Sequence, residues 1–148
     1  MARYKASVDT LLGRDEMFAY LSDFSSTQEW DPGVVEAAQL SDPPVHEGSE
    51  FRVVAEFLGR KTELIYRVVE YDPPNAVTVR GENASVVSLD RITFQQVGEA
   101  TRITYDADLA LKGAFRLADP LLALAFKRVG DRALAGMRST LAARRPAA

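Results

Sequence analysis

The 148-residue sequence has no cysteine and only one histidine, His46. Without cysteine the chain has no disulfide, no thiolate nucleophile and no cysteine-ligated zinc. A catalytic triad or a histidine-based general acid would depend on His46, which lies in a Pro- and Gly-containing stretch, residues 43–48, typical of an exposed loop. The glycines match neither a P-loop nor a dinucleotide-binding motif. The sequence therefore predicts no metal site and no cofactor.

Long apolar runs and an excess of basic residues are also missing. The longest uncharged apolar run, residues 121–126, is far too short to span a bilayer, and the first residues do not resemble a signal peptide. A net charge of −3 gives no electrostatic basis for binding nucleic acid. We therefore expect one cytoplasmic domain over residues 1–148, without integral membrane association. Its oligomeric state, monomer or dimer, stays open, and the excess of arginine over lysine indicates a GC-rich bacterial genome.

From residue 51 to residue 111 the sequence reads almost entirely as β-strand. In most of these runs, charged side chains occupy one set of alternate positions and leave the other set uncharged. Because alternate residues of a strand point to opposite faces, the uncharged sets predict an apolar concave face on an antiparallel sheet. The residues expected on that face are Phe51, Val53, Ala55, Phe57, Leu64, Tyr66, Val68, Val77, Val79, Gly81, Ile103, Tyr105, Ala107, Leu109 and Leu111.

The first hairpin of this sheet also has a predicted register. We expect residues 59–60 to form a two-residue turn, which would place Ala55 opposite Leu64 and Glu56 opposite Glu63. A like-charge pair of this kind is mildly unfavourable, by roughly 0.2–1 kcal/mol. Burying an unpaired charge on the other face would cost several kcal/mol, so the expected inward face is retained.

One strand, residues 86–94, leaves its facing open. If Ile92 points inward then Asp90 does too, whereas Val87 and Leu89 belong to the opposite set. A β-bulge would reconcile the two sets. Asp90 is therefore either inside the sheet or moved to its rim.

An inward Asp90 would be a carboxyl group in apolar surroundings. Burial would raise its pKa, and the neutral form would then be available as a proton donor. Tyr66, Asn83 and Tyr105 lie on inferred inward faces and are its expected neighbours. Such a group could orient a carbonyl-bearing ligand and promote its enolisation, which makes Asp90 the one candidate catalytic residue.

Short elements precede the sheet. Residues 3–9 alternate as a half-buried strand, and residues 15–24 have helical spacing. A second short helix is expected after Ser26, which stands in capping-box relation to Glu29. A further strand is expected over residues 34–40.

The C-terminal helix is predicted over residues 119–143. Asp119 is a good N-cap, and Pro120 suits the first helical position. At 1.5 Å per residue the helix would run about 36 Å, long enough to cross the sheet. Gly130 and Gly136 are expected to allow close packing, with space for a ligand as the alternative. The apolar stripe comprises Leu122, Phe126, Val129, Ala133, Met137 and Leu141.

Three segments carry a family resemblance that extends over nearly the whole chain. They are residues 18–24 leading to Glu29-Trp30, residues 69–74, and Gly98 followed by residues 101–105. With the order of the elements, they resemble the START-like helix-grip (SRPBCC) superfamily, and within it the polyketide cyclase/dehydrase and lipid-transport group. The resemblance implies an α+β helix-grip fold: a curved antiparallel sheet of about seven strands wrapped on a long C-terminal helix, with two short helices after the first strand. It also implies a deep apolar cavity between the sheet and the helix.

Members of this group bind lipids, sterols, polyketides, quinones or plant hormones, and some catalyse cyclisation or dehydration. The leading hypothesis is a carrier or sensor that binds a small hydrophobic molecule, lipid-, polyketide- or quinone-like, without integral membrane or nucleic-acid contacts. Trp30 has two possible roles, a ligand contact at the entrance or a packed aromatic plug. The expected ligand-binding residues are Trp30, Phe51, Val53, Phe57, Tyr66, Val79, Asn83, Tyr105, Leu109, Phe126, Val129 and Met137.

Two other functions stay open. The first is a cyclase- or dehydratase-type enzyme that acts on a polyketide-like substrate through Asp90 with Tyr66 or Tyr105. The second is a protein-interaction module whose cavity is filled by its own bulky side chains.

Overall fold

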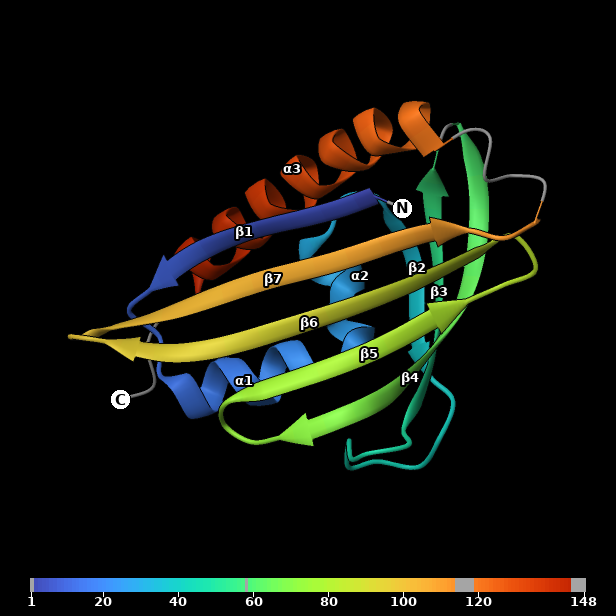
Figure 1. Cartoon of the computed structure of the whole chain (residues 1–148). Helices are drawn as coiled ribbons and strands as arrows, with labels where there is room; N and C mark the ends of the chain where they lie inside the picture. Colours follow the sequence, from blue (N-terminus) through green and yellow to red (C-terminus); the bar gives the residue numbers. More distant parts are fainter. Residues whose placement is uncertain (1, 58, 114–118, 145–148) are drawn as a thin grey trace.

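The fold is built on one curved antiparallel sheet. The computed structural model describes residues 2–57, 59–113 and 119–144, and at Phe57, Asp119, Pro120 and Leu122 it describes the backbone alone. The seven strands are arranged in the order β1-β7-β6-β5-β4-β3-β2, so that β1 and β2 form the two edges (Figure 1). Their bounds are β1 Ala2–Thr10, β2 Val34–Gln39, β3 Glu50–Phe57, β4 Arg60–Asp72, β5 Ala76–Glu82, β6 Val86–Val97 and β7 Ala100–Leu111.

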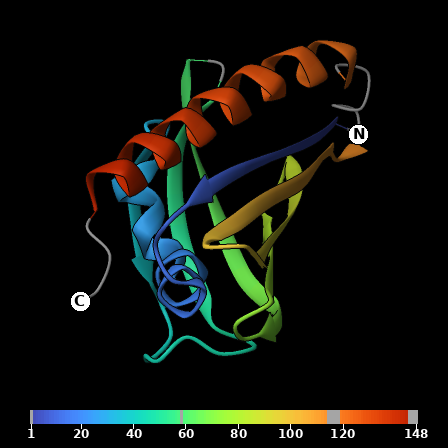
Figure 2. The same cartoon turned by 90° about the vertical axis from the view of Figure 1, so that its left-hand side faces the viewer.

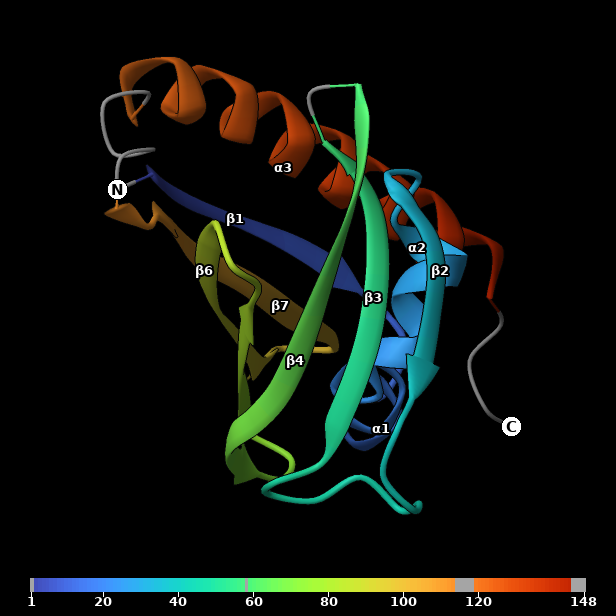
Figure 3. The same cartoon turned by 90° about the vertical axis from the view of Figure 1, so that its right-hand side faces the viewer.

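Helices occupy the concave side of the sheet. The short helices α1 (Arg14–Ser22), η1 (Phe24–Ser26, a 3-10 helix) and α2 (Thr27–Trp30) lie inside the curl at one end (Figure 2). The long helix α3 (Asp119–Ala143) runs across the open side of the curl and contacts β1 and α2 (Figure 3). Together with the sheet, this confirms the expected α+β helix-grip architecture. None of the helices in the described ranges has the length and apolarity to cross a membrane.

The expected inward face of the sheet is correct, but the predicted register of the β3–β4 hairpin is wrong. Phe57 pairs with Arg60 and Val53 pairs with Leu64, a shift of two residues from the expected register. The side-chain period of a strand is also two, so the shift leaves every side chain on its predicted face. It removes the expected like-charge pair: Glu56 now lies opposite Lys61.

Strand β6 has no bulge, and its inner face includes Asp90. The strand pairs continuously with β5 on one side and β7 on the other. Ile92 is fully buried and Asp90 is 5% exposed, while Leu89 is 41% exposed on the outer face. The expected bulge is therefore absent, and irregularities occur instead in β2 and β4.

The two glycines of α3 mark its closest contacts. A Cβ atom added to Gly130 would lie 2.6 Å from the ring of Tyr4, and one added to Gly136 would overlap the backbone oxygen of Trp30. Both glycines therefore serve packing, against β1 and against the end of α2.

The predicted capping box at the start of α2 is wrong. The Ser26 side chain makes no capping hydrogen bond, and its hydroxyl oxygen accepts the indole N–H of Trp30 at 3.2 Å. Asp23 caps the preceding turn instead, because its carboxylate accepts the backbone N–H of Ser25 at 3.0 Å. The expected cap by the Asp119 side chain lies outside the described part of the chain.

Candidate functional site

Half of the space between the sheet and its helices is filled by packed side chains. On the helix side, Met17 and Leu21 are fully buried and Trp30 is 3% exposed. On the sheet side, this half is closed by Phe51, Val53, Val68, Val79, Ile92, Phe94 and Ile103, with Met137 from α3. Trp30 packs edge-on against Tyr105, with 6.2 Å between ring centroids. Trp30 is therefore part of the packed core, as the plug alternative requires.

The other half contains a cavity of about 670 Å³ between β3, β4, β6, β7 and the first half of α3. Its exposed lining residues, among them Arg60, Lys61 and Leu121, lie at the end of the β3–β4 hairpin and the first turn of α3. This is the open side of the cavity. The apolar wall consists of Ala55, Leu64, Val86, Leu109, Leu111, Leu121, Phe126 and Val129.

The predicted ligand-binding residues separate into two groups in the structure. One group lines the cavity: Tyr66, Asn83, Leu109, Phe126 and Val129. The other belongs to the packed core: Trp30, Phe51, Val53, Val79 and Met137. Tyr105 lies beside Asp90, and the side chain of Phe57 lies outside the described part of the chain.

Asn83 borders the cavity, but its amide group is bonded to the backbone. Its oxygen accepts the backbone N–H groups of Ser85 and Val86 at 2.8 and 3.0 Å. Its nitrogen donates to the backbone oxygen of Glu63 at 3.0 Å. The side chain therefore holds the β5–β6 turn against β4.

A polar cluster is centred on Asp90 at the inner end of the cavity. One carboxylate oxygen of Asp90 accepts the Ser88 hydroxyl and the other accepts the Tyr105 hydroxyl, each at 2.5 Å. Ser88 lines the cavity, whereas Asp90 lies just behind it. Burial raises the pKa of Asp90 to about 6, against the opposing effect of these two hydrogen bonds.

Tyr66 reaches this cluster across β5 because residue 81 is a glycine. Tyr66 on β4 is paired with Gly81, which is paired in turn with Ser88 on β6. A Cβ atom on residue 81 would lie 2.5 Å from the Tyr66 ring, so any larger residue would displace the ring. Burial raises the pKa of Tyr66 well above its ordinary value, and the charge of Asp90 raises it further.

Asp31, which follows α2, is the second carboxyl group at the inner end of the cavity. It lines the cavity with Gly33, and its Oδ1 accepts the Gly33 backbone N–H at 2.8 Å. Burial raises the pKa of Asp31, and its charge contributes to raising the pKa of Asp90. Asp31 and Ser88 were not predicted as site residues from the sequence. Ser88 could have been found from its alternation with Asp90, but nothing in the sequence brings Asp31 to β4 and β6.

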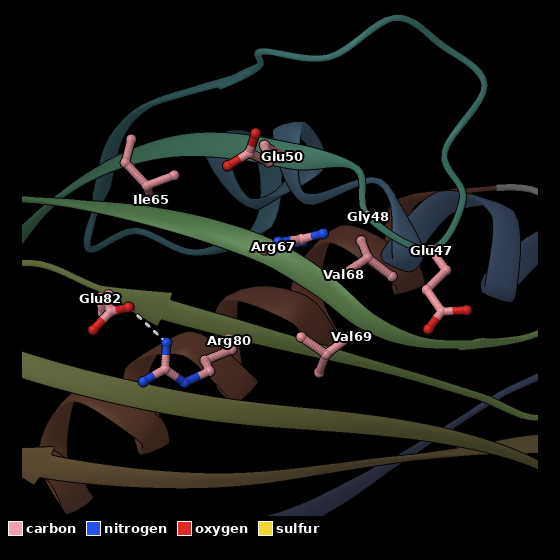
Figure 4. A pocket seen from close by; sticks show the side chains of 9 residues that line it. All are labelled: Glu47, Gly48, Glu50, Ile65, Arg67, Val68, Val69, Arg80 and Glu82. Carbon is pink, nitrogen blue, oxygen red and sulfur yellow. Dashed lines mark hydrogen bonds and ion pairs between the residues drawn. The ribbon is translucent and has the colours of Figure 1, made fainter.

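A second hollow, of about 720 Å³, lies on the outer face of the sheet (Figure 4). It is lined by charged side chains of both signs, among them Glu50, Arg67 and Arg80, and Arg80 forms an ion pair with Glu82 at 2.6 Å. The two hollows are of similar volume, so lining chemistry distinguishes them. The inner cavity is the one with apolar walls and a polar end, the usual form of a small-molecule site.

His46 is exposed in the loop before β3, as expected. Its Nδ1 lies 2.9 Å from the Pro44 backbone oxygen and 3.2 Å from the Ser49 hydroxyl. Across the described ranges, no group of three or more histidine, aspartate or glutamate residues is placed to hold a metal ion.

The sequence matches the model of one protein family over residues 1–142, the family described as polyketide cyclase/dehydrase and lipid transport. The chain belongs to this family. No curated protein matches the sequence. The family membership agrees with the resemblance found in the motifs around Trp30, residues 69–74 and Gly98.

Solved structures share the fold at low sequence identity. A START superfamily protein from Mycobacterium smegmatis superposes with a TM-score of 0.79 at 14% identity, over 95% of this chain and 97% of that protein. A protein from Thermus thermophilus gives 0.79 at 15% identity, with the same coverages. The Zhui aromatase/cyclase from Streptomyces sp. R1128 gives 0.74 at 12% identity, over 94% of this chain and 90% of that protein. At these identities the similarity establishes a common fold.

Proposed function

We propose that this protein binds a small hydrophobic molecule in the cavity between the sheet and α3, as a carrier or sensor. The observation that carries this proposal is the cavity of about 670 Å³, with apolar walls and a polar inner end. Its volume lies within the roughly 300–1,000 Å³ usual for small-molecule sites. Lipid- and quinone-like molecules combine a large apolar body with few oxygen atoms, which suits this lining, and the additional oxygen atoms of a polyketide-like molecule would need the polar inner end.

The family supports the proposal without naming the ligand. Its description includes both polyketide chemistry and lipid transport. The apolar wall discriminates weakly between ligands, since one methylene group in such a pocket changes binding by only about 1–3 kcal/mol. The polar inner end is therefore the part of the cavity that would discriminate between chemical classes of ligand.

Native mass spectrometry of the purified protein, followed by solvent extraction, tests the proposal directly. We expect a bound molecule, or binding of fluorescent fatty-acid or aromatic probes by the empty protein. The probe should be displaced by an apolar competitor and should bind more weakly when Val129, on the α3 side of the cavity, is replaced by Trp. Persistent absence of cargo, together with no binding of either probe, would contradict the proposal.

A second candidate function is a cyclase- or dehydratase-type reaction on a polyketide-like substrate. It is favoured by one observation: a buried carboxyl group with a pKa of about 6 is hydrogen-bonded to Tyr105 behind the cavity wall. A carboxyl group in this range could exchange a proton near neutral pH, and Ser88, which donates to Asp90 and lines the cavity, would connect it to a substrate. A similar fold occurs in an aromatase/cyclase, the Zhui protein.

The variant Asp90→Asn distinguishes the two functions. If the protein is an enzyme of this type, the variant should lose turnover and still bind the probe. For a carrier, no turnover of polyketide-like substrates is expected from either form. Tyr105→Phe is the matched partner, because it removes the hydroxyl that donates to Asp90 and leaves the ring that packs on Trp30.

The protein-interaction alternative required a cavity filled by side chains. This describes only the half of the concave face around Met17, Phe51 and Trp30. The open half, lined by Leu64 and Val129, is the feature that favours a ligand over a protein partner.

A further inference from the structure

The inner end of the cavity contains more hydrogen-bond acceptors than donors. Ser88 and Tyr105 each donate their only hydroxyl hydrogen to Asp90. The Gly33 backbone N–H is directed at one oxygen of Asp31. Within the described ranges no donor reaches the second oxygen of Asp31, Oδ2. The hydroxyl hydrogen of Tyr66 is therefore the one side-chain donor of this cluster that is not bonded to a carboxylate, and its partner within the cluster is the Ser88 hydroxyl.

Asp31 is partly buried, and its Oδ2 is open to the cavity. A ligand that displaces water from this oxygen must replace the hydrogen bond, because leaving a charged acceptor without a donor costs about 1–3 kcal/mol or more. A ligand with an O–H group would supply that donor. The same oxygen atom of the ligand could accept the Tyr66 hydroxyl, because a hydroxyl group both donates and accepts. Tyr66 and Asp31 both line the cavity, and they lie near enough for the charge of Asp31 to help raise the pKa of Tyr66.

A carboxylate ligand has the opposite properties. It has no hydrogen to donate, and it would bring a negative charge beside Asp31, with Asp90 directly behind the wall. The positive residues of the lining, Arg60 and Lys61, are exposed on the open side and are accompanied there by Glu56. Solvent screens these outer charges far more than those at the inner end. Among the lining residues that the structure describes, none is a buried positive group for an anionic head.

We propose that Asp31 makes the cavity selective for neutral ligands that carry an alcohol or phenol hydroxyl and excludes carboxylates of the same size. This inference rests on the ligand binding proposed above and names the ligand class. Asp31 acts as the acceptor of the ligand hydroxyl, and Tyr66 acts as its donor. Asp90 does not contact the ligand and holds Ser88 and Tyr105 in place.

Three naphthalenes of similar size test the proposal on the wild-type protein by isothermal titration calorimetry at pH 8. They are 2-naphthol, 2-methoxynaphthalene, which lacks the hydrogen, and 2-naphthoate, which is anionic. We expect 2-naphthol to bind at least about tenfold more tightly than 2-methoxynaphthalene, a difference of about 1.4 kcal/mol. It should bind at least about a hundredfold more tightly than 2-naphthoate.

The variant Asp31→Asn tests the assigned residue. Its amide oxygen can still accept the Gly33 N–H, so the turn after α2 is retained. We expect the preference for 2-naphthol over 2-naphthoate to fall to about threefold or less. The control Glu56→Gln removes a charge from the exposed side of the lining and should leave the preference within about twofold of wild type.

The outcomes separate this inference from the proposed function. If none of the three molecules and no apolar probe binds the wild-type protein, the binding function itself is contradicted. If 2-naphthol and 2-naphthoate bind equally, or Asp31→Asn keeps the full preference, the binding stands and the selectivity is wrong. Tighter binding of 2-naphthylmethylammonium than of 2-naphthol would also overturn the inference, because the site would then select for a positive charge and not for a neutral hydroxyl group. The wild-type comparison remains decisive if Asp31→Asn does not fold.

Discussion

The two halves of the concave face have the same kind of strand pattern and different contents. In the half beside α1 and α2, side chains from both layers interlock, and Met17, Phe51 and Met137 are fully buried. In the half beneath the first turns of α3, the strands present Leu64 and Leu109 to a cavity. The difference lies in what covers them. The short helices bring aromatic and long apolar side chains to the filled half, whereas α3 rests on β1 and α2 and only borders the open half.

The largest expected effect is on stability in the filled half. Phe51→Ala removes a fully buried ring that packs near Phe24, with 6.3 Å between centroids, and should lower the free energy of unfolding by about 3–5 kcal/mol. Phe126→Ala, the matched change beside the cavity, should lower the free energy of unfolding by about 1 kcal/mol, because this ring is only half-buried and loses less contact. Urea unfolding followed by circular dichroism measures both. Equal losses would remove the distinction between the halves.

The next effect comes from Asp90, which lies where the two halves meet. Its pKa of about 6 in the folded chain exceeds the unfolded value of 3.8, so folding is favoured when the group is protonated. The stabilisation, roughly 3 kcal/mol, is complete below the unfolded pKa and is lost as the pH rises from about 4 to about 6. Asp90→Asn should lose this component of the pH dependence of the unfolding free energy.

Chemical denaturation at a series of pH values measures that difference. The control Asp42→Asn alters an exposed carboxyl group and should reproduce the wild-type slope. If the free energy of unfolding of Asp90→Asn changed with pH between 4 and 6 as steeply as that of the wild-type protein, Asp90 would not be the group that causes this pH dependence.

A smaller effect is expected where α3 meets α2. Gly136→Ala places a methyl group against the backbone of Trp30 and should destabilise the protein by about 1–3 kcal/mol. Helix propensity alone would act in the other direction, by about 1 kcal/mol. Ala135→Gly, at the exposed neighbouring position, should lower the free energy of unfolding by about 1 kcal/mol through helix propensity alone. Thermal or urea unfolding distinguishes steric overlap from helix propensity. If Gly136→Ala stabilised the protein, the contact between α3 and the Trp30 backbone would have room for a methyl group.

The smallest effect on stability is expected from filling the cavity. Val129→Trp should change the free energy of unfolding by less than about 1 kcal/mol, because the larger side chain enters existing space. Probe binding should nevertheless be weakened. Val97→Trp, at the exposed end of β6, is the control and should leave probe binding unchanged. A destabilisation of several kcal/mol by Val129→Trp would indicate that this half is packed too.

The limits of prediction from sequence are visible in particular residues. Alternation assigned Val53, Leu64 and Leu109 to the inner face correctly, because a charge on that face would be too costly. The β3–β4 register was predicted two residues away from its place, since such a shift leaves every side chain on the same face. The facing of Asp90 stayed open, because Val87 and Leu89 suited the inner face as well as Ile92 did.

The sequence alone determined the apolar face, because a charge buried on that face would be costly, and the order of its elements with the family motifs indicated the fold class. Its family motifs agreed with the matched family model over residues 1–142. Only the tertiary structure decided which part of that face is filled and which part is open. It also decided that Asp31, from the end of α2, joins Tyr66, Ser88 and Asp90 at the inner end of the cavity. Strand alternation fixes the face of each side chain, whereas contacts between distant segments depend on how the curved sheet and its helices meet.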